Sequence, residues 1–191
     1  MSRTNRRQAR RHAFHLIFGL PFTPANVETL ARARAFYYEF LEEDTTDYGF
    51  EELIRPKGRD AEYVDRAFWG VFERLAQLDG VIENFLRDWT IGRLNKVDLA
   101  LMRLSIYEML CEPDVPIGAA VNEAVELAKE YGADESAAFI NGVLGNVARE
   151  IKRKDAGTLQ RESVGKDADP LQSESESSLQ SEIANKGAGE A

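Results

Sequence analysis

Several features are scarce or missing in this chain of 191 residues, and each shortage excludes a class of protein. Cys111 is the single cysteine, which excludes an intrachain disulfide framework and a cysteine-rich metal site and fits a reducing, cytoplasmic environment. No apolar run approaches the roughly 18 residues of a membrane span, and we expect no signal segment. No stretch of useful length alternates polar and apolar residues as a strand would, so we expect an all-α protein without membrane contact.

Motifs of catalysis and of metal binding are also missing. The two histidines, His12 and His15, have no cysteine or carboxylate at metal-ligand spacing, which favours ordinary packed or solvated histidines. The sequence contains no Gly-rich phosphate loop, nucleophile elbow or HExxH motif. Its many carboxylates fall on polar faces of the expected helices, where solvation is their ordinary role. We therefore expect a binding protein, with no enzymatic activity, no cofactor and no metal.

Charge is distributed unevenly along the chain. Residues 1–15 contain five arginines and no acidic residue, whereas residues 155–191 contain eight acidic residues against three basic ones. Because these two ends cancel, the body between them carries the net charge of −9 of the whole chain. An acidic body with one basic end indicates a localised contact with an anion, and it leaves acidic surface for a different, basic partner.

Hydrophobic periodicity predicts about seven helices. They are expected at residues 3–18, 26–43, 60–78, 79–89, 95–110, 116–132 and from 134 past 151, with a loop over 44–59 that holds at most one short helix at 50–54. Asn26, Asp60 and Asn95 are placed as N-caps, and Gly132 as a left-handed C-cap. The helix over 95–110 is apolar on most sides, which places it in the centre of a bundle.

Composition changes after Lys154. Residues 155–191 contain no aromatic side chain and few aliphatic ones, too few to offset an ordering entropy of ~1–2 kcal/mol per residue. We therefore expect a helical domain over residues 1–154 and a disordered acidic tail over 155–191. In the helix before this tail, Gly142 and Gly145 would allow a neighbouring helix to come close.

The N-terminal stretch Arg3–Phe18 carries the strongest functional signal. At about 100° per residue, one helical arc holds its five arginines and continues through two phenylalanines, while Ala9, Ala13, Leu16 and Ile17 fall on the other side. Positive charge at a helix N-terminus interacts unfavourably with the macrodipole, by roughly 0.3–1 kcal/mol per exposed charge. Helix stability alone therefore does not explain why the arginines are there. Phosphates would reverse that sign, and unpaired bases could stack on the adjacent aromatic rings.

Three interpretations of this stretch stay open: a transit peptide, a solvated basic helix without a ligand, and a contact with nucleic acid or an anionic surface. The third is favoured. A transit peptide is disfavoured because the N-terminus has a single early serine, Ser2, and continues directly into core-like residues. Phe14 and Phe18 by themselves are more typical of core residues than of platforms for bases.

Five segments of this chain form a recognisable series: RRQARRHAFHLIF at the start, VDLALMRLSIYEML at 97–110, DVP at 114–116, VNEAVELAKEYG at 121–132 and FINGVLG at 139–145. In this order they closely resemble the bacterial transcription antitermination protein NusB family. The resemblance spans residues 3 to about 152, is dense after Trp89 and is loose between Gly19 and Arg59. It implies two packed helical subdomains, residues 1–78 and 79–154.

The resemblance also implies a function. Members of this family bind single-stranded boxA RNA together with NusE, a ribosomal protein, and join RNA polymerase with other Nus factors to suppress termination on ribosomal RNA operons. Some relatives form homodimers that cover the RNA-binding surface, and the sequence leaves both states open.

Individual positions follow from the same resemblance and from the helical arc. Arg6, Arg7 and Arg10 fall on the family's RNA-contacting arginines, whereas Gln8 departs from members that have another arginine there. The full set of expected RNA-binding residues is Arg3, Arg6, Arg7, Arg10, Arg11, Phe18 and Phe139. Asp98 and, more weakly, Glu126 are expected to contact NusE.

Two other functions fit the same residues. A NusB-like domain also occurs as the RNA-binding part of ribosomal RNA cytosine methyltransferases, and here no methyl-donor-binding pattern follows it. Alternatively, the chain is a helical adaptor that binds only protein, with arginines that serve solubility.

Overall fold

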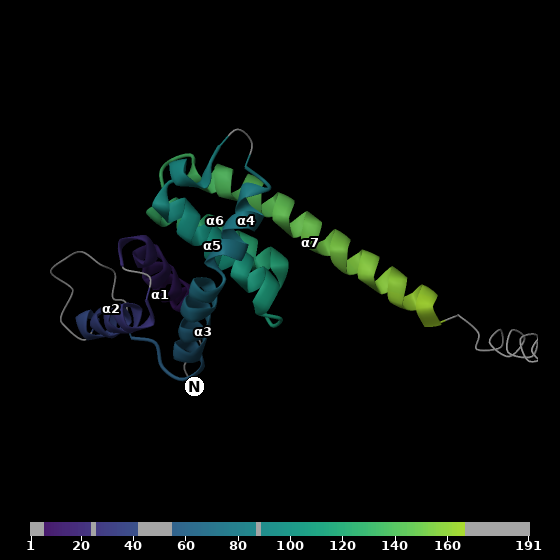
Figure 1. The fold of residues 1–191 in the computed structure, drawn as a ribbon. Coiled ribbons are helices and arrows are strands. Elements are labelled where there is room, and N and C mark those ends of the chain that lie inside the picture. Colours follow the sequence, from purple (N-terminus) through teal and green to yellow (C-terminus); the bar gives the residue numbers. More distant parts are fainter. Residues whose placement is uncertain (1–5, 24–25, 42–54, 87–88, 167–191) are drawn as a thin grey trace, which may run out of the picture. The chain divides into compact units, whose positions relative to one another are not determined.

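A computed structural model describes residues 6–23, 26–41, 55–86 and 89–166, with side chains up to residue 154. These residues form helices and short turns, and no strand occurs among them (Figure 1). The chain divides into two units, residues 1–149 and residues 150–191. An all-α fold of about seven helices was expected, and it is confirmed.

The helices are named in chain order. They are α1 (Arg6–Gly19), η1 (Leu20–Phe22), α2 (Val27–Phe40), α3 (Arg59–Glu73), α4 (Leu75–Glu83), η3 (Ile91–Arg93), α5 (Lys96–Cys111), α6 (Ile117–Tyr131) and α7 (Ser136–Lys166). Among the described residues, no helix has both the length and the apolarity to cross a bilayer. Most of the expected 44–59 loop, with its short helix, lies outside the described residues.

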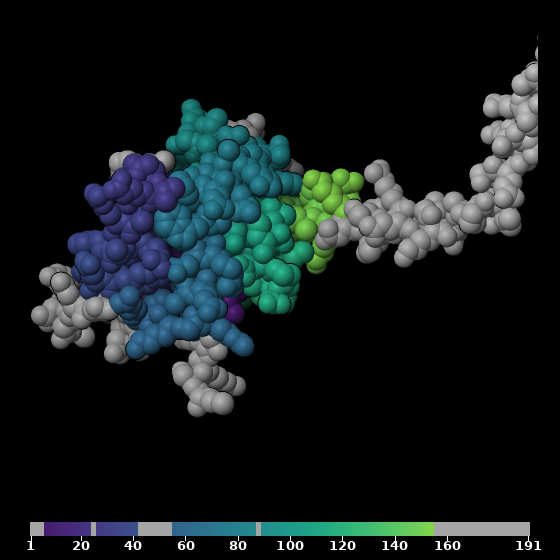
Figure 2. Space-filling view, turned by 60° about the horizontal axis from the view of Figure 1, so that its bottom comes forward, coloured from purple at the N-terminus to yellow at the C-terminus, as the bar shows by residue number. Residues whose placement is uncertain are grey.

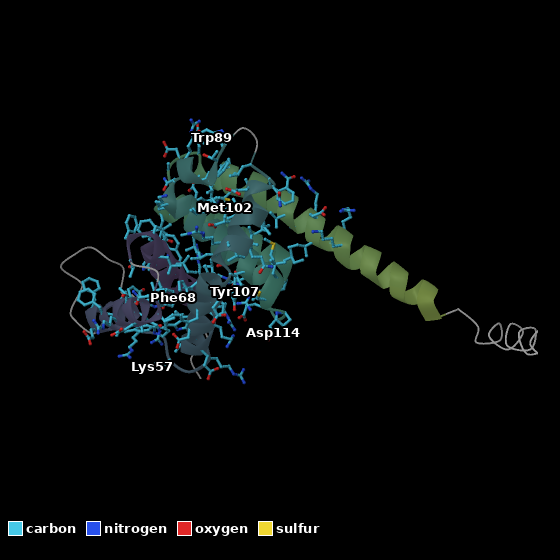
Figure 3. The ribbon with its side chains drawn as sticks, in the orientation of Figure 1. Lys57, Phe68, Trp89, Met102, Tyr107 and Asp114 are labelled. Carbon is cyan, nitrogen blue, oxygen red and sulfur yellow. The ribbon has the colours of Figure 1, made fainter. Side chains whose placement is uncertain are left out.

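Helix α5 forms the centre of the first unit, as its apolar sequence predicts. Every residue from Asp98 to Met109 is buried, and the helix packs against α1, α3, α4 and α6. Figure 3 places Met102 and Tyr107 of this helix in the interior with Phe68 of α3. Gly70 of α3 is required here, because any Cβ at this position would collide with the Tyr107 ring.

Helix boundaries confirm two expected caps and correct two others. The side chain of Asn26 accepts from the backbone N–H of Thr29 at 2.8 Å, and that of Asn95 accepts from Val97 at 2.9 Å. Asp60 is not a cap: α3 begins one residue before it, after Gly58 at φ 56°. Gly132 is extended rather than left-handed, with φ −91°, and its lack of a side chain matters because a Cβ would lie 2.6 Å from the Ala128 carbonyl oxygen.

The boundary between α3 and α4 differs from the predicted one. A single apolar stripe through Leu78 indicated one helix to that residue, but Arg74 leaves helical geometry with φ −112° and α4 begins at Leu75. Helix α4 then ends at Glu83, so Trp89 is not part of it, and the Trp89 side chain is 59% exposed. The stripe stays in phase across the break, which explains why periodicity alone missed it.

Helix α7 corrects three further expectations. It begins at Ser136 rather than Asp134, and the Ser136 hydroxyl accepts from the backbone N–H of Ala133 at 3.0 Å. It continues to Lys166, past the predicted start of disorder at residue 155. Around Gly142 and Gly145 there is open space rather than a closely packed helix, because an added Cβ at either would meet nothing within 4 Å.

Candidate functional site

Helix α1 is held by its small apolar face, as the sequence predicts. Ala9, Ala13 and Ile17 are almost fully buried, and the helix packs against α3 and α5. In the space-filling view of Figure 2, only a small purple area from the start of α1 reaches the side of the surface that is drawn. The arginines of α1 range from 8% to 50% in side-chain exposure, so each is described separately.

Arg10 lies inside the protein. Its Nε donates to both carboxylate oxygens of Glu108 of α5, at 2.8 and 3.1 Å, and the Tyr63 hydroxyl donates to the same carboxylate at 2.7 Å. Burial raises the pKa of Glu108, and Arg10 acts against that rise. An Arg10 side chain that is 8% exposed ties α1 to α5, which leaves it little surface for the RNA contact that was expected of it.

The other described arginines of α1 differ in exposure. Arg11 is 15% exposed and reaches Glu130 of α6 at 2.6 Å, while the guanidinium of Arg6 lies over the Tyr63 ring at 4.8 Å. Arg7 is 50% exposed and lies 4.0 Å from Glu126, also on α6. Arg7 is thus the most accessible of the expected RNA contacts in α1, and Arg3 lies outside the described residues.

Carboxylates of α6 line the arginine side of α1. Glu123 is 3.7 Å from Arg10, and Glu126 binds Lys129 at 2.6 Å on its own helix. Lys129 and then Arg7 lower the pKa of Glu126. Glu126, which was expected to contact NusE, therefore lies beside the expected RNA contacts.

An aromatic row continues the arginine arc toward η1. Phe14 is 2% exposed, which confirms it as a core residue, and its ring centroid is 6.1 Å from that of Phe18. Phe18 is partly exposed and lies 5.5 Å from Phe22, which is 67% exposed. Phe18 keeps a surface on which a base can stack, and Phe22 extends it; the sequence pattern missed Phe22 because Pro21 and Pro24 indicated only a break.

Both histidines are packed, in agreement with the expectation for them. Nδ1 of His12 is 2.8 Å from the Tyr37 hydroxyl, and Nδ1 of His15 is 3.3 Å from it. Burial, with a smaller effect of His12, lowers the pKa of His15 to about 4. Among the described residues no group of His, Cys, Asp and Glu could hold a metal ion.

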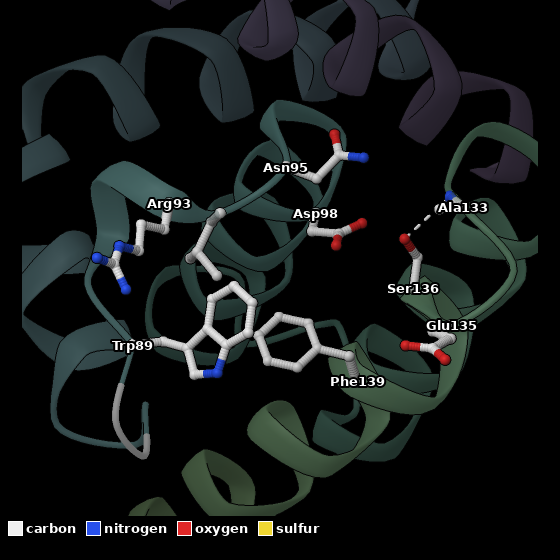
Figure 4. A pocket seen from close by; sticks show the side chains of 9 residues that line it. Trp89, Arg93, Asn95, Asp98, Ala133, Glu135, Ser136 and Phe139 are labelled. Atoms are coloured by element: carbon white, nitrogen blue, oxygen red, sulfur yellow. Dashed lines mark hydrogen bonds between the residues drawn. The ribbon is translucent and has the colours of Figure 1, made fainter.

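A pocket of about 370 Å³ lies at the N-terminal end of α5 (Figure 4). It is lined by Trp89, Arg93, Leu94, Asn95, Asp98, Ala133, Glu135, Ser136 and Phe139. Asp98 and Phe139, which the resemblance assigned to NusE and to RNA, therefore share one pocket. Sequence reasoning missed mainly Trp89 and Glu135 as lining residues, since apolar periodicity placed Trp89 in a helix over 79–89 that ends at Glu83.

Asp98 is the unusual residue of this pocket. It is 7% exposed, and its Oδ1 has no hydrogen-bond partner among the described residues. Burial raises the pKa of Asp98, and a hydrogen bond from Ser136 acts against that rise. The pocket therefore contains a buried carboxylate oxygen with an unused capacity to accept a hydrogen bond.

The family model and the relatives that match this chain all carry the name NusB. Residues 7–149 match the NusB family. The transcription antitermination protein NusB of Nitratidesulfovibrio vulgaris is 36% identical over 147 residues, covering 77% of this chain and 89% of the relative. That of Clostridium botulinum, strain Loch Maree, is 40% identical over 143 residues, covering 75% of this chain and 99% of the relative.

Solved structures show the same fold. A structure of T. maritima NusB is similar with a TM-score of 0.59 and 31% identity, over 78% of this chain and 94% of that one. A structure of the antitermination factors NusB and NusE with double-stranded RNA is similar with a TM-score of 0.58 and 21% identity, over 76% of this chain and 96% of that one. With its family match over most of the described helices, this chain belongs to the NusB family.

Proposed function

We propose that this protein is a transcription antitermination factor that binds single-stranded boxA RNA together with NusE. It acts in the cytoplasm with RNA polymerase and other Nus factors, above all on ribosomal RNA operons. The observation that carries this proposal is the accessible Arg7 at the start of α1, in a chain of the NusB family. The N-terminal end of a helix attracts phosphate through its free N–H groups, and Arg7 adds a positive charge there.

The RNA-binding face is smaller than the sequence arc. Arg7 and Arg6 reach the surface of α1, whereas Arg10 and Arg11 are engaged with Glu108 and Glu130. We therefore assign Arg10 and Arg11 to positioning α1, and we keep Arg6, Arg7 and Arg3 as phosphate contacts. Phe18 and Phe22 provide the adjacent stacking surface, since aromatic rings bind unpaired bases of any sequence.

The number of phosphate contacts predicts the salt dependence. With two or three contacts, log K should fall with log salt at a slope of roughly −1.4 to −2, at about −0.7 per contact on a single strand. This is shallower than five arginines would give. The acidic body, with a net charge of −9, leaves surface for a basic protein such as NusE, and long-range attraction speeds that association.

An electrophoretic mobility experiment tests this function. BoxA RNA is titrated with this protein alone, with NusE alone and with both, and an RNA of scrambled sequence is the control. We expect weak binding by the protein alone and tighter binding of boxA with NusE present. Equal affinity for the scrambled RNA, or no binding with NusE present, would refute the proposal.

One observation favours a second function, that of an adaptor that binds only protein. The carboxylates of Glu108, Glu126 and Glu130 already face arginines of α1, so an anion has less positive charge to bind than the sequence indicates. In that case this protein binds NusE, and the affinity of NusE for RNA is the same with and without this protein. The same titration separates the two functions.

A further inference from the structure

The Glu126 carboxylate of α6 is shared by two cations, one on its own helix and one on α1. Its Oε1 accepts a hydrogen bond from Nζ of Lys129 at 2.6 Å, whereas its Oε2 lies 4.0 Å from the guanidinium of Arg7. Glu126 and Lys129 are three residues apart, so helical geometry puts both on one face of α6. The carboxylate is therefore closely paired with Lys129 and only loosely with Arg7.

The two distances decide how much of Arg7 is available to a ligand. At 4.0 Å a guanidinium nitrogen and a carboxylate oxygen are too far apart to form a hydrogen bond, and only their charges attract each other. At 2.6 Å the Lys129 ammonium forms both a hydrogen bond and an ion pair. In agreement with this order, Lys129 lowers the pKa of Glu126 more than Arg7 does. Lys129 thus holds a carboxylate that is also attracted to Arg7.

The neighbouring pair on the same two helices shows the closed alternative. Glu130 lies one turn further along α6 and reaches the guanidinium of Arg11 at 2.6 Å. The Arg11 side chain is only 15% exposed, compared with 50% for Arg7. A carboxylate of α6 can therefore form a close pair with an arginine of α1. Glu126 does not form such a pair with Arg7, and its bond to Lys129 accounts for the difference.

We propose that Lys129 is a positioning residue for RNA binding: by pairing with Glu126, it keeps the guanidinium of Arg7 available for a phosphate of single-stranded RNA. The inference rests on the proposed function, in which Arg7 contacts RNA, and it adds the residues that control this contact. A phosphate and a carboxylate carry charge of the same sign and compete for one guanidinium. Without Lys129, the Glu126 carboxylate closes on Arg7, and RNA has to displace it.

Fluorescence anisotropy of labelled boxA RNA tests this inference, with NusE at a saturating concentration so that changes in NusE affinity do not enter the result. Lys129→Gln removes the charge that holds Glu126, and we expect RNA affinity to fall roughly two- to fivefold, within the range of an exposed ion pair. Glu126→Gln removes the competing charge and should raise RNA affinity by up to about fivefold. In the double variant, Glu126→Gln should restore at least the affinity of the unmodified protein.

A second double variant separates this local effect from the overall charge of the protein. Glu28 of α2 is a 77% exposed carboxylate that pairs with Arg32. Lys129→Gln combined with Glu28→Gln has the same net charge as the unmodified protein, but it keeps the Glu126 carboxylate. We expect its RNA affinity to stay as low as that of Lys129→Gln alone. Equal recovery in the two double variants would mean that long-range charge sets the affinity, and it would overturn the inference.

The effect of Lys129 should also depend on Arg7. In the Arg7→Ala background, Lys129→Gln should weaken RNA binding no further, because the guanidinium through which Lys129 acts is gone. If Lys129→Gln weakens binding equally with and without Arg7, and Glu126→Gln restores nothing, Lys129 contacts the RNA itself and the inference is wrong.

The remaining outcomes distinguish this inference from the proposed function. Full RNA affinity in Lys129→Gln refutes the inference and leaves the proposed function standing, whereas failure of the unmodified protein to bind boxA with NusE present refutes both. Thermal unfolding checks the fold, and Tm should hardly change, because the Lys129 side chain is 58% exposed. A lower Tm in Lys129→Gln that Glu126→Gln does not restore would make Lys129 a structural residue and overturn the inference.

Discussion

Two regions of this protein each bury a carboxylate, but among the described residues only one of them supplies a counter-ion. These regions are the junction of α1 with α5 and the pocket at the start of α5. In the junction, the Arg10 guanidinium meets Glu108, and Tyr63 completes the hydrogen bonds of that carboxylate. In the pocket, Asp98 is almost as buried but keeps one oxygen without a partner. The difference teaches that a charged residue is structural where the fold supplies its counter-ion, and available for a ligand where the fold does not.

The same distinction divides the arginines of α1. Arg10 and Arg11 are 8% and 15% exposed and have carboxylates at 2.8 and 2.6 Å, whereas Arg7 is 50% exposed and its nearest carboxylate is at 4.0 Å. One arc of identical residues thus contains residues that hold the helix in place and a residue that can contact a ligand. Its salt-bridge partners come from α5 and α6, more than a hundred residues away for Arg7 and Arg11.

Breaking the junction should have the largest effect. Arg10→Ala leaves the Glu108 carboxylate buried without its counter-ion, and we expect the free energy of unfolding to fall by about 3–5 kcal/mol. Urea unfolding followed by circular dichroism measures this loss. Arg7→Ala is the control, because a substitution of an exposed side chain usually changes stability by less than ~0.5 kcal/mol. Equal loss in the two variants would contradict the distinction drawn here.

The second largest effect is a loss of stability at acidic pH, and it comes from the packed His15. Burial lowers the pKa of His15 to about 4, so the folded state favours the neutral ring and stability is lost as pH falls from the ordinary value near 6.5 toward 4. Between pH 7.5 and 5 this loss should be about 2 kcal/mol. His15→Gln should remove that part of the pH dependence in urea unfolding, and an NMR titration midpoint near 6.5 for His15 would contradict it.

RNA affinity should separate the exposed from the engaged arginines. Arg7→Ala is expected to weaken boxA binding roughly three- to tenfold and to make the salt slope shallower by about 0.7, the loss of one phosphate contact. Arg11→Ala should have a smaller effect on the slope, because Glu130 already engages its guanidinium. Fluorescence anisotropy over a series of salt concentrations measures both quantities, and identical slopes for the two variants would argue against this division.

The smallest effect concerns the unpaired carboxylate itself. Because burial raises the pKa of Asp98, the folded state holds its proton more tightly, and stability is lost as pH rises through that pKa. Asp98→Asn should therefore be as stable as the unmodified protein or slightly more stable at pH 7, by less than ~1 kcal/mol, and this gain should disappear below about pH 4. A clear loss of stability at pH 7 would mean that the charged carboxylate is stabilised by the fold, through the hydrogen bond from Ser136, by more than its burial costs.

The sequence pattern predicted those features that depend on residues close together along the chain. Asn26 and Asn95 cap helices through side chains that reach two or three residues ahead, and the apolar stripe of α3 reflects which face is buried. The break at Arg74 was missed because the stripe continues in phase on both sides of it. Trp89 was placed in a helix for the same reason, although its exposure is what makes it part of the pocket.

The sequence by itself determined the all-α class, the central place of α5, the basic start of α1 and the family, because periodicity, composition and short motifs are properties of neighbouring residues. Only the tertiary structure decided which charged side chains form ion pairs within the protein. Arg10 meets Glu108 and Arg11 meets Glu130 across the fold, and Asp98 meets no equivalent partner among the described residues. Pairing of charges depends on distances between helices, and these distances are fixed by packing rather than by order along the chain.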